Sequence, residues 1–198
     1  MEPFRALAQP WWVNLLILIP FVAYVIFRRK GLTLPVRLLV LVTIFGIAFG
    51  YVEAAVVVYL RAAIGLLPGY MGTLSDVARL SRQAYQQAKA AGQMPQSLLT
   101  VELFREAATM FMLIAVALLS ASRAADRWAI FLWAFAFWDI TYYLALWATV
   151  CWPFSLTNDD VLFLIPVPWI SQVWFPAVVS GLTLLAILLA RGRRGRTH

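Results

Sequence analysis

The chain has 198 residues, of which 63% are hydrophobic and 13% are charged, and its mean hydropathy is +0.82. A soluble domain of this length is usually near half apolar and about a quarter charged, so the composition is typical of a membrane protein. The net charge of +7 does not indicate a nucleic-acid partner, because the Lys and Arg residues mostly flank hydrophobic runs. We expect a single transmembrane domain over residues 1–198.

The hydrophobic runs predict five membrane spans. A helix needs roughly 20 apolar residues to cross the hydrocarbon core of a bilayer. The expected fold is therefore an all-α integral membrane protein, a five-helix transmembrane bundle. The spans are predicted at residues 11–27, 36–60, 98–119, 128–150 and 171–190.

Two further segments are expected on the outer side of the bundle. Residues 75–91, "SDVARLSRQAYQQAKAA", predict an amphipathic helix that could lie on the outer surface. Residues 159–170, "DDVLFLIPVPWI", are apolar but contain Pro166 and Pro168, and the run before Pro166 is too short to span. We expect a Pro-broken re-entrant or interfacial hairpin there, since non-helical backbone at membrane depth must be buried in protein or line a cavity.

The basic residues predict how the bundle is oriented. Most of the sixteen Lys and Arg flank the same set of span ends, whereas loop 151–170 has none. By the positive-inside rule, the basic side is cytoplasmic. This predicts a multi-pass protein of the cell membrane with the N-terminus outside and the C-terminus in the cytoplasm. Loop 61–97 is nominally outside but also holds four basic residues.

Three acids within the spans are the strongest functional signal. Asp139, in "WAFAFWDITYYLALW", is eleven residues, roughly 16 Å, from Trp128 and near the bilayer midplane. Glu53 and Glu106 lie in the outer half of their spans. A charge at the bilayer centre costs about 2.5–3.5 kcal/mol on insertion scales, so such acids face a bundle interior or a wet cavity. We expect Glu53, Glu106 and Asp139 to be the catalytic acids of an outward-opening pocket.

Several neighbours are candidates for binding a substrate in that pocket. Tyr142 and Tyr143 follow Asp139 by three and four residues, so their phenols share its helix face. The close carboxylates of Glu102 and Glu106 need a proton, a cation or an arginine between them. The candidate binding residues are Arg61, Glu102, Arg105, Trp138, Tyr142, Tyr143 and Asp160.

Each of these residues also has a structural interpretation. Gly46, Gly50 and Ala54 are spaced by four, so another helix can approach the helix of Glu53 closely. A buried ionic network there could simply fix the helix register. Glu102 could be a helix-start charge and Asp160 an N-cap, and Trp138 could serve helix packing alone.

Histidine and cysteine usage excludes several kinds of site. The only His is His198, the last residue, and the only Cys is Cys151. A bis-His haem, a catalytic His, a zinc cluster and an iron–sulfur site are therefore disfavoured. We expect no cofactor; a metal, if any, would be a carboxylate-bound divalent cation such as Ca, Mg or Mn.

Four blocks, "YVEAAVVVYLR", "LFREAATMFML", "FWDITYYLAL" and "DVLFLIPVPW", resemble a group of prokaryotic polytopic membrane proteins. The resemblance covers roughly residues 50–190 and implies one membrane module, but no activity is associated with that group. The Trp-rich translocator-protein family also has five helices, but none of that family's motif blocks is present in this chain.

Three function classes remain open. The first is an intramembrane enzyme that performs acid–base chemistry on a lipidic or isoprenoid-like substrate. The second is a binding or transport component for a cation or a small amphiphile. The third is an accessory subunit whose acids pair with a partner chain. The expected partners are accordingly membrane lipid, a small hydrophobic or cationic ligand, and partner membrane subunits.

Overall fold

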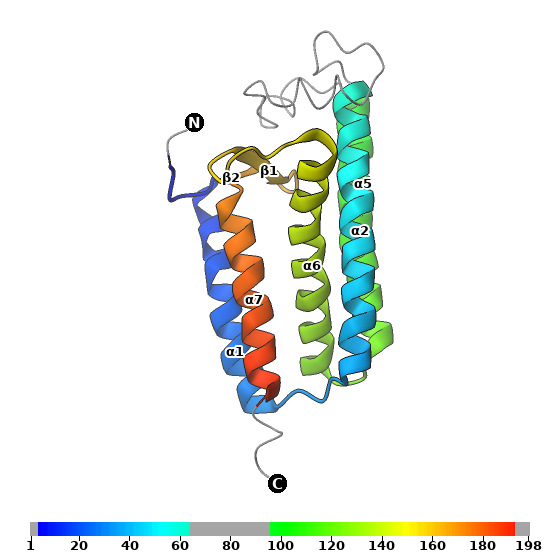
Figure 1. The fold of residues 1–198 in the computed structure, drawn as a ribbon, viewed down its shortest axis with the longest axis vertical. Helices are drawn as coiled ribbons and strands as arrows, with labels where there is room; N and C mark the ends of the chain where they lie inside the picture. Colours follow the sequence, from blue (N-terminus) through cyan, green and yellow to red (C-terminus); the bar gives the residue numbers. More distant parts are fainter. Residues whose placement is uncertain (1–3, 64–95, 193–198) are drawn as a thin grey trace.

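The computed structural model of the protein describes residues 4–63 and 96–192. These residues form a bundle of long helices with one small sheet at an end (Figure 1). The predicted amphipathic helix at residues 75–91 lies outside the described residues. In chain order the elements are η1 (Trp11–Leu18), α1 (Ile19–Lys30), α2 (Val36–Ala63), α5 (Gln96–Ser120), α6 (Ala124–Val150), β1 (Asp159–Phe163), β2 (Trp169–Gln172) and α7 (Trp174–Gly192).

Five helices in the described part of the chain are long and apolar enough to cross a membrane, as many as the sequence predicts. The first is a 3₁₀-helix up to Leu18 and continues as α1. Most boundaries differ from the prediction by a few residues, and two helix starts show it clearly. The fourth helix begins at Ala124 instead of residue 128, and the fifth begins at Trp174 because residues 171 and 172 belong to a strand.

Helix α6 is the centre of the bundle. It packs against α2, α5 and α7, and α1 packs against α7 (Figure 1). More than half of the α6 span, 56%, is buried inside the protein, compared with 22% of the α5 span. Residues of α6 therefore face several helices at once, whereas most of α5 is left to face the surroundings.

The closest helix contact is between α2 and α6, and two glycines make it. A Cβ atom at Gly46 would lie 2.8 Å from the Cβ of Phe137, and one at Gly50 would lie 2.6 Å from the backbone oxygen of Trp138. Both distances are shorter than van der Waals contact, so only glycine allows the backbones to approach this closely. The close approach expected from the four-residue spacing of small residues is present, and α6 is the partner.

The end of the bundle next to α6 and α7 is closed by a β-hairpin, not by a helix. Strands β1 and β2 pair antiparallel, with Asp160 opposite Ser171 and Val161 opposite Ile170. The extended segment before η1 joins them, since Gln9 exchanges two backbone hydrogen bonds with Ile170, both 2.7 Å long. The expectation of an all-α protein is therefore wrong at this point. Asp160 is not an N-cap but a strand residue with 1% exposure.

At the opposite end, one acid connects two loops. Asp126, in the first turn of α6, accepts hydrogen bonds from the backbone N–H of Thr33 (2.9 Å) and from the Thr33 hydroxyl. Arg123 also lies within 3.6 Å of its carboxylate. These contacts hold the α1–α2 connection against the start of α6, so Asp126 has a structural role far from the hairpin.

Candidate functional site

A cavity of about 560 Å³ lies among the helices and reaches the hairpin. Its walls come from η1, α1, α2, α5, α6 and α7, together with both strands of the hairpin and the turn between them. Most of the lining side chains are aliphatic or aromatic. The carboxyl groups among them belong to Glu53, Glu102, Glu106, Asp139 and Asp160. The structure thus brings the three predicted catalytic acids to one cavity, while their roles stay predictions.

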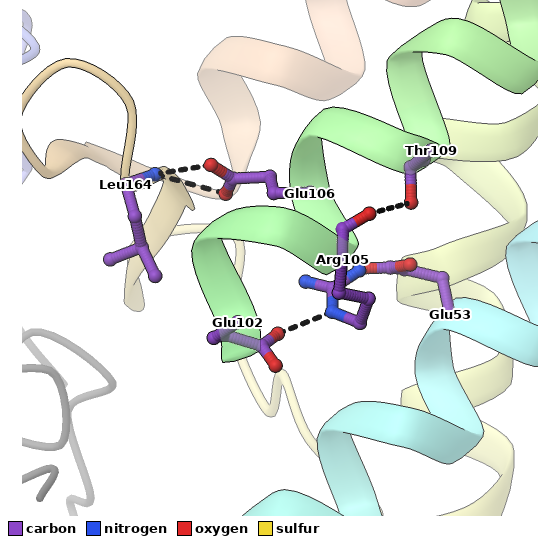
Figure 2. Close-up of polar contacts among 6 residues, drawn as sticks. All are labelled: Glu53, Glu102, Arg105, Glu106, Thr109 and Leu164. Atoms are coloured by element: carbon purple, nitrogen blue, oxygen red, sulfur yellow. Dashed lines mark hydrogen bonds and ion pairs between the residues drawn. The ribbon is translucent and has the colours of Figure 1, made fainter. Parts of the chain in front are cut away.

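Arg105 connects two of these acids across two helices. Its Nη1 lies 2.5 Å from Glu53 Oε1 on α2, and its Nε lies 2.5 Å from Glu102 Oε1 one turn earlier on α5. Figure 2 shows the guanidinium between the two carboxylates. Charged groups inside a protein are stable only when paired and hydrogen-bonded, and this arrangement provides both. Glu102 is therefore an ion-pair partner with 6% exposure and not a solvated helix-start charge.

Glu106 follows Arg105 in sequence but points to the other side of α5, toward the hairpin (Figure 2). Both of its carboxylate oxygens accept the backbone N–H of Leu164, at 2.9 and 3.0 Å. Leu164 directly follows β1, so this contact ties the turn of the hairpin to α5. The expected repulsion between Glu102 and Glu106 is avoided because each carboxylate has a different partner.

Asp139 has a partner on a different helix from the one expected. Its Oδ2 accepts a 2.7 Å hydrogen bond from the hydroxyl of Ser180 on α7. The phenol of Tyr143, which we expected to serve Asp139, donates to Asp160 Oδ2 at 2.9 Å. Tyr142 lines the same cavity and its ring contacts that of Tyr143 at 4.9 Å between centroids. Asp139 is thus bonded across the bundle, where it links α6 to α7.

Aromatic rings form one continuous wall of the cavity. Trp138 packs against Phe135 (5.1 Å between ring centroids) and Phe163 (6.2 Å), and Phe163 packs against Trp169 (5.2 Å). All four side chains line the cavity. Trp169, the first residue of β2, thus extends this wall into the hairpin. Such rings suit an apolar ligand, and their faces also attract positive charge.

Sequence reasoning missed the small polar residues of the site. Ser180 and Thr183 on α7 and Thr109 on α5 are buried and line the cavity. Thr183 and Thr109 each donate to a carbonyl one turn earlier in their own helix, which satisfies their hydroxyls locally. Three polar residues within otherwise apolar spans were the available signal, but Ser and Thr are common enough in such helices that the acids stood out first.

Two predicted features have no structural test. The side chain of Arg61 lies outside the described residues, so its part in the site stays a prediction. Among residues 4–63 and 96–192, no three His, Cys, Asp or Glu side chains are grouped closely enough to hold a metal ion. A divalent cation bound by fewer carboxylates also stays a prediction.

Comparison with protein-family models, with curated proteins and with solved structures finds no match for this chain. The functional interpretation therefore depends on the chemistry of the cavity itself. That cavity combines apolar and aromatic walls with carboxyl groups held in place from other elements. An arrangement of this kind can bind an amphiphile and exchange protons with its polar end.

Proposed function

We propose that this protein is a multi-pass membrane enzyme that performs acid–base chemistry on a lipidic, isoprenoid-like substrate bound in the cavity. One observation carries the proposal: Asp139 and Glu106, from different helices, line a cavity of about 560 Å³ whose other walls are mainly apolar and aromatic. A carboxyl group next to an apolar ligand is placed to give or take a proton where water does not compete.

The route into the cavity favours a substrate that is dissolved in the membrane. Phe111 lines the cavity and is also 70% exposed, in the middle of the candidate span of α5. Leu16 and Ile19 of the first span line the cavity as well. Among the described elements, α5 packs mainly on α6 and α1 packs mainly on α7, so we infer that a membrane-dissolved substrate enters between α5 and the first span.

The two carboxyl groups suit complementary roles. Asp139, with one hydroxyl donor from Ser180, would act as the acid that protonates a double bond or an oxygen of the substrate. Glu106, fixed by the N–H of Leu164, would accept a proton from a neighbouring carbon. One proton then enters the substrate and one leaves, which amounts to an isomerisation. The faces of Trp138, Phe135 and Phe163 would stabilise the positive charge that develops between the two steps.

A second candidate function is binding or transport of a cationic amphiphile. It is favoured by the excess of carboxyl groups over cationic groups in the cavity lining, where Arg105 is the one cationic side chain among the described residues. In this function the same cavity holds the ligand and no covalent bond changes.

Lipid occupancy tests whether the cavity is the ligand site. The protein is purified in detergent, and bound lipid is measured by native mass spectrometry. Ala107 lines the cavity, whereas the next residue, Ala108, is exposed on α5 and does not line it. We expect Ala107→Trp to lose the bound lipid and Ala108→Trp to keep it. Equal occupancy in both variants would place the lipid elsewhere.

Solvent deuterium tests the chemistry separately from binding. The purified protein is incubated in D₂O with a membrane lipid extract, and the lipids are analysed by mass spectrometry. We expect the wild type to place deuterium on carbon in one lipid species, and Asp139→Asn and Glu106→Gln to abolish this, because an amide cannot exchange the required proton. Lipid that is bound but never deuterated by the wild type would eliminate the enzyme and leave the binding or transport function.

A further inference from the structure

Among the described residues, the cationic group of the cavity lining is already paired with the protein, whereas the buried indole N–H groups of Trp138 and Trp169 have no hydrogen-bond partner. Phosphate sites are built from Arg or Lys side chains and from free amides at helix N-termini. Among the described residues that line the cavity, the one cationic side chain is Arg105, and it carries Glu53 and Glu102 on its Nη1 and Nε. The guanidinium charge is thus shared by two carboxylates before any ligand arrives.

Two backbone amides next to the cavity, those of Leu164 and Trp174, are engaged as well. The N–H of Leu164 donates to Glu106. The helix N-terminus that reaches the cavity is that of α7, through Phe175 and Pro176. There, Trp174 donates its N–H to the oxygen of Leu156 at 2.9 Å, and Pro176 has no N–H to offer. This terminus therefore provides a poor cradle for an anion.

Beside the neutral indole N–H groups of Trp138 and Trp169, carboxyl groups dominate the polar part of the cavity lining among the described residues. Five carboxyl groups line it against one guanidinium. Ser180 gives its proton to Asp139, and Tyr143 gives its own to Asp160. A ligand head group that donates hydrogen bonds or carries positive charge complements this lining, whereas a phosphate would meet like charge.

We propose that the cavity selects a lipid whose head group is an alcohol or an amine and discriminates against the same lipid bearing a phosphate. The inference deepens the proposed function and depends on the cavity being its ligand site. It narrows the substrate class from any lipidic molecule to uncharged or cationic isoprenoid-like amphiphiles. Like charges brought together in a desolvated site cost enough to weaken binding by more than about tenfold.

Three ligands that share the same farnesyl group and differ only in the head group test the proposal: farnesol, farnesylamine and farnesyl phosphate. Their apparent affinities for the full-length protein in detergent are measured by thermal shift and by native mass spectrometry. We expect farnesol or farnesylamine to bind at least about tenfold more tightly than farnesyl phosphate. Equal or tighter binding of the phosphate, lost in Ala107→Trp, would overturn this inference but leave the cavity as a lipid site. No cavity binding of any of the three would overturn the proposed function itself.

A charge variant adds a prediction that a merely apolar cavity would not make. Glu102→Gln removes one carboxylate charge and leaves Arg105 with Glu53 as its remaining ionic partner, so we expect it to improve binding of farnesyl phosphate and to weaken binding of farnesylamine. Asp159→Asn is the matched control, because Asp159 is a buried acid of β1 that pairs with Arg5 and does not line the cavity. It should leave both affinities unchanged. If Glu102→Gln changes neither affinity, charge does not decide the selection and the inference fails.

Discussion

Arg105 is the one cationic side chain among the described residues that line the cavity, and it pairs with two carboxylates. Its side chain is 23% exposed, and the side chains of its partners, Glu53 and Glu102, are 12% and 8% exposed. Removing such groups from water costs several kcal/mol per ion, and the cost is recovered only while all partners are present. The three residues therefore act as one unit that joins α5 to α2 at the edge of the cavity.

Breaking this unit at its centre should destabilise the protein. We expect Arg105→Gln to reduce the free energy of unfolding by about 3–5 kcal/mol, because it leaves two buried carboxylates without their cation. Glu53→Gln should cost less, since Arg105 keeps Glu102. Thermal unfolding of the purified variants in one detergent measures both effects.

The double variant Glu53→Gln with Arg105→Gln is the control for this interpretation. It removes the arginine together with one of the two carboxylates, so it should melt above Arg105→Gln alone. If the single variant Arg105→Gln melts like the wild type, water and not the guanidinium stabilises the carboxylate charges of Glu53 and Glu102.

At the scale of elements, the α2–α6 contact sets the position of the aromatic wall and of Asp139. We expect Gly50→Ala to destabilise the protein by about 1–3 kcal/mol, the usual cost of overpacking. The added methyl would lie 2.6 Å from the backbone oxygen of Trp138, which cannot move aside as a side-chain tip can. Melting temperature measures the loss, and ligand affinity should fall with it because Trp138 and Asp139 move together.

Gly181 offers a matched control in α7. A Cβ atom there meets nothing within 4 Å, so Gly181→Ala should be neutral or should stabilise the helix by about 0.5–1 kcal/mol. If both alanine variants melt alike, the close approach of α2 and α6 does not limit stability.

The helices were predictable from the sequence and their partners were not. Apolar runs of spanning length have few other solutions in a membrane, which is why the spans were found. The spacing of Gly46, Gly50 and Ala54 indicated a close helix contact, but such spacing does not say which helix fills it. The hairpin was missed as a sheet because Pro166 and Pro168 indicate only a break, and a strand of five residues has no distinctive period.

The same contrast holds for the site: the sequence predicts which acids face inward, but not which residues they contact. The free-energy cost of exposing a carboxylate to lipid is enough to predict that Glu53, Glu106 and Asp139 face inward. Their partners depend on which helices meet: Ser180 is 41 residues from Asp139, and Leu164 is 58 residues from Glu106. For Tyr143, helical spacing pointed to Asp139, whereas the hairpin brings Asp160 to the phenol. Pairing across distant segments is decided by tertiary packing, which no local pattern encodes.

At the scale of the whole molecule, acidic and basic residues are unevenly distributed along the bundle axis, although Asp126 lies at the basic end and Arg5 and Arg105 lie at the hairpin end. The hairpin and the acids of α2 and α5 lie toward one end, and the α1–α2 connection and the end of α7 lie at the other (Figure 1). The basic residues Arg28, Arg29 and Lys30 end α1, and Arg191 lies in the last turn of α7. This uneven distribution is independent of which end faces the cytoplasm, so orientation is a separate question with its own experiment.

The positive-inside rule predicts that the basic end is cytoplasmic and that the cavity's hairpin end faces outward. Single cysteines are introduced at Gly195, beyond the end of α7, and at Leu156, which is 60% exposed beside the hairpin, in a chain whose native Cys151 is changed to Ser. A membrane-impermeant thiol reagent is then applied to intact cells. We expect Leu156→Cys to react at once and Gly195→Cys to react only after the cells are permeabilised. The reverse labelling pattern would show the opposite orientation in the membrane. The carboxyl groups of the cavity would then take up and release their protons on the cytoplasmic side.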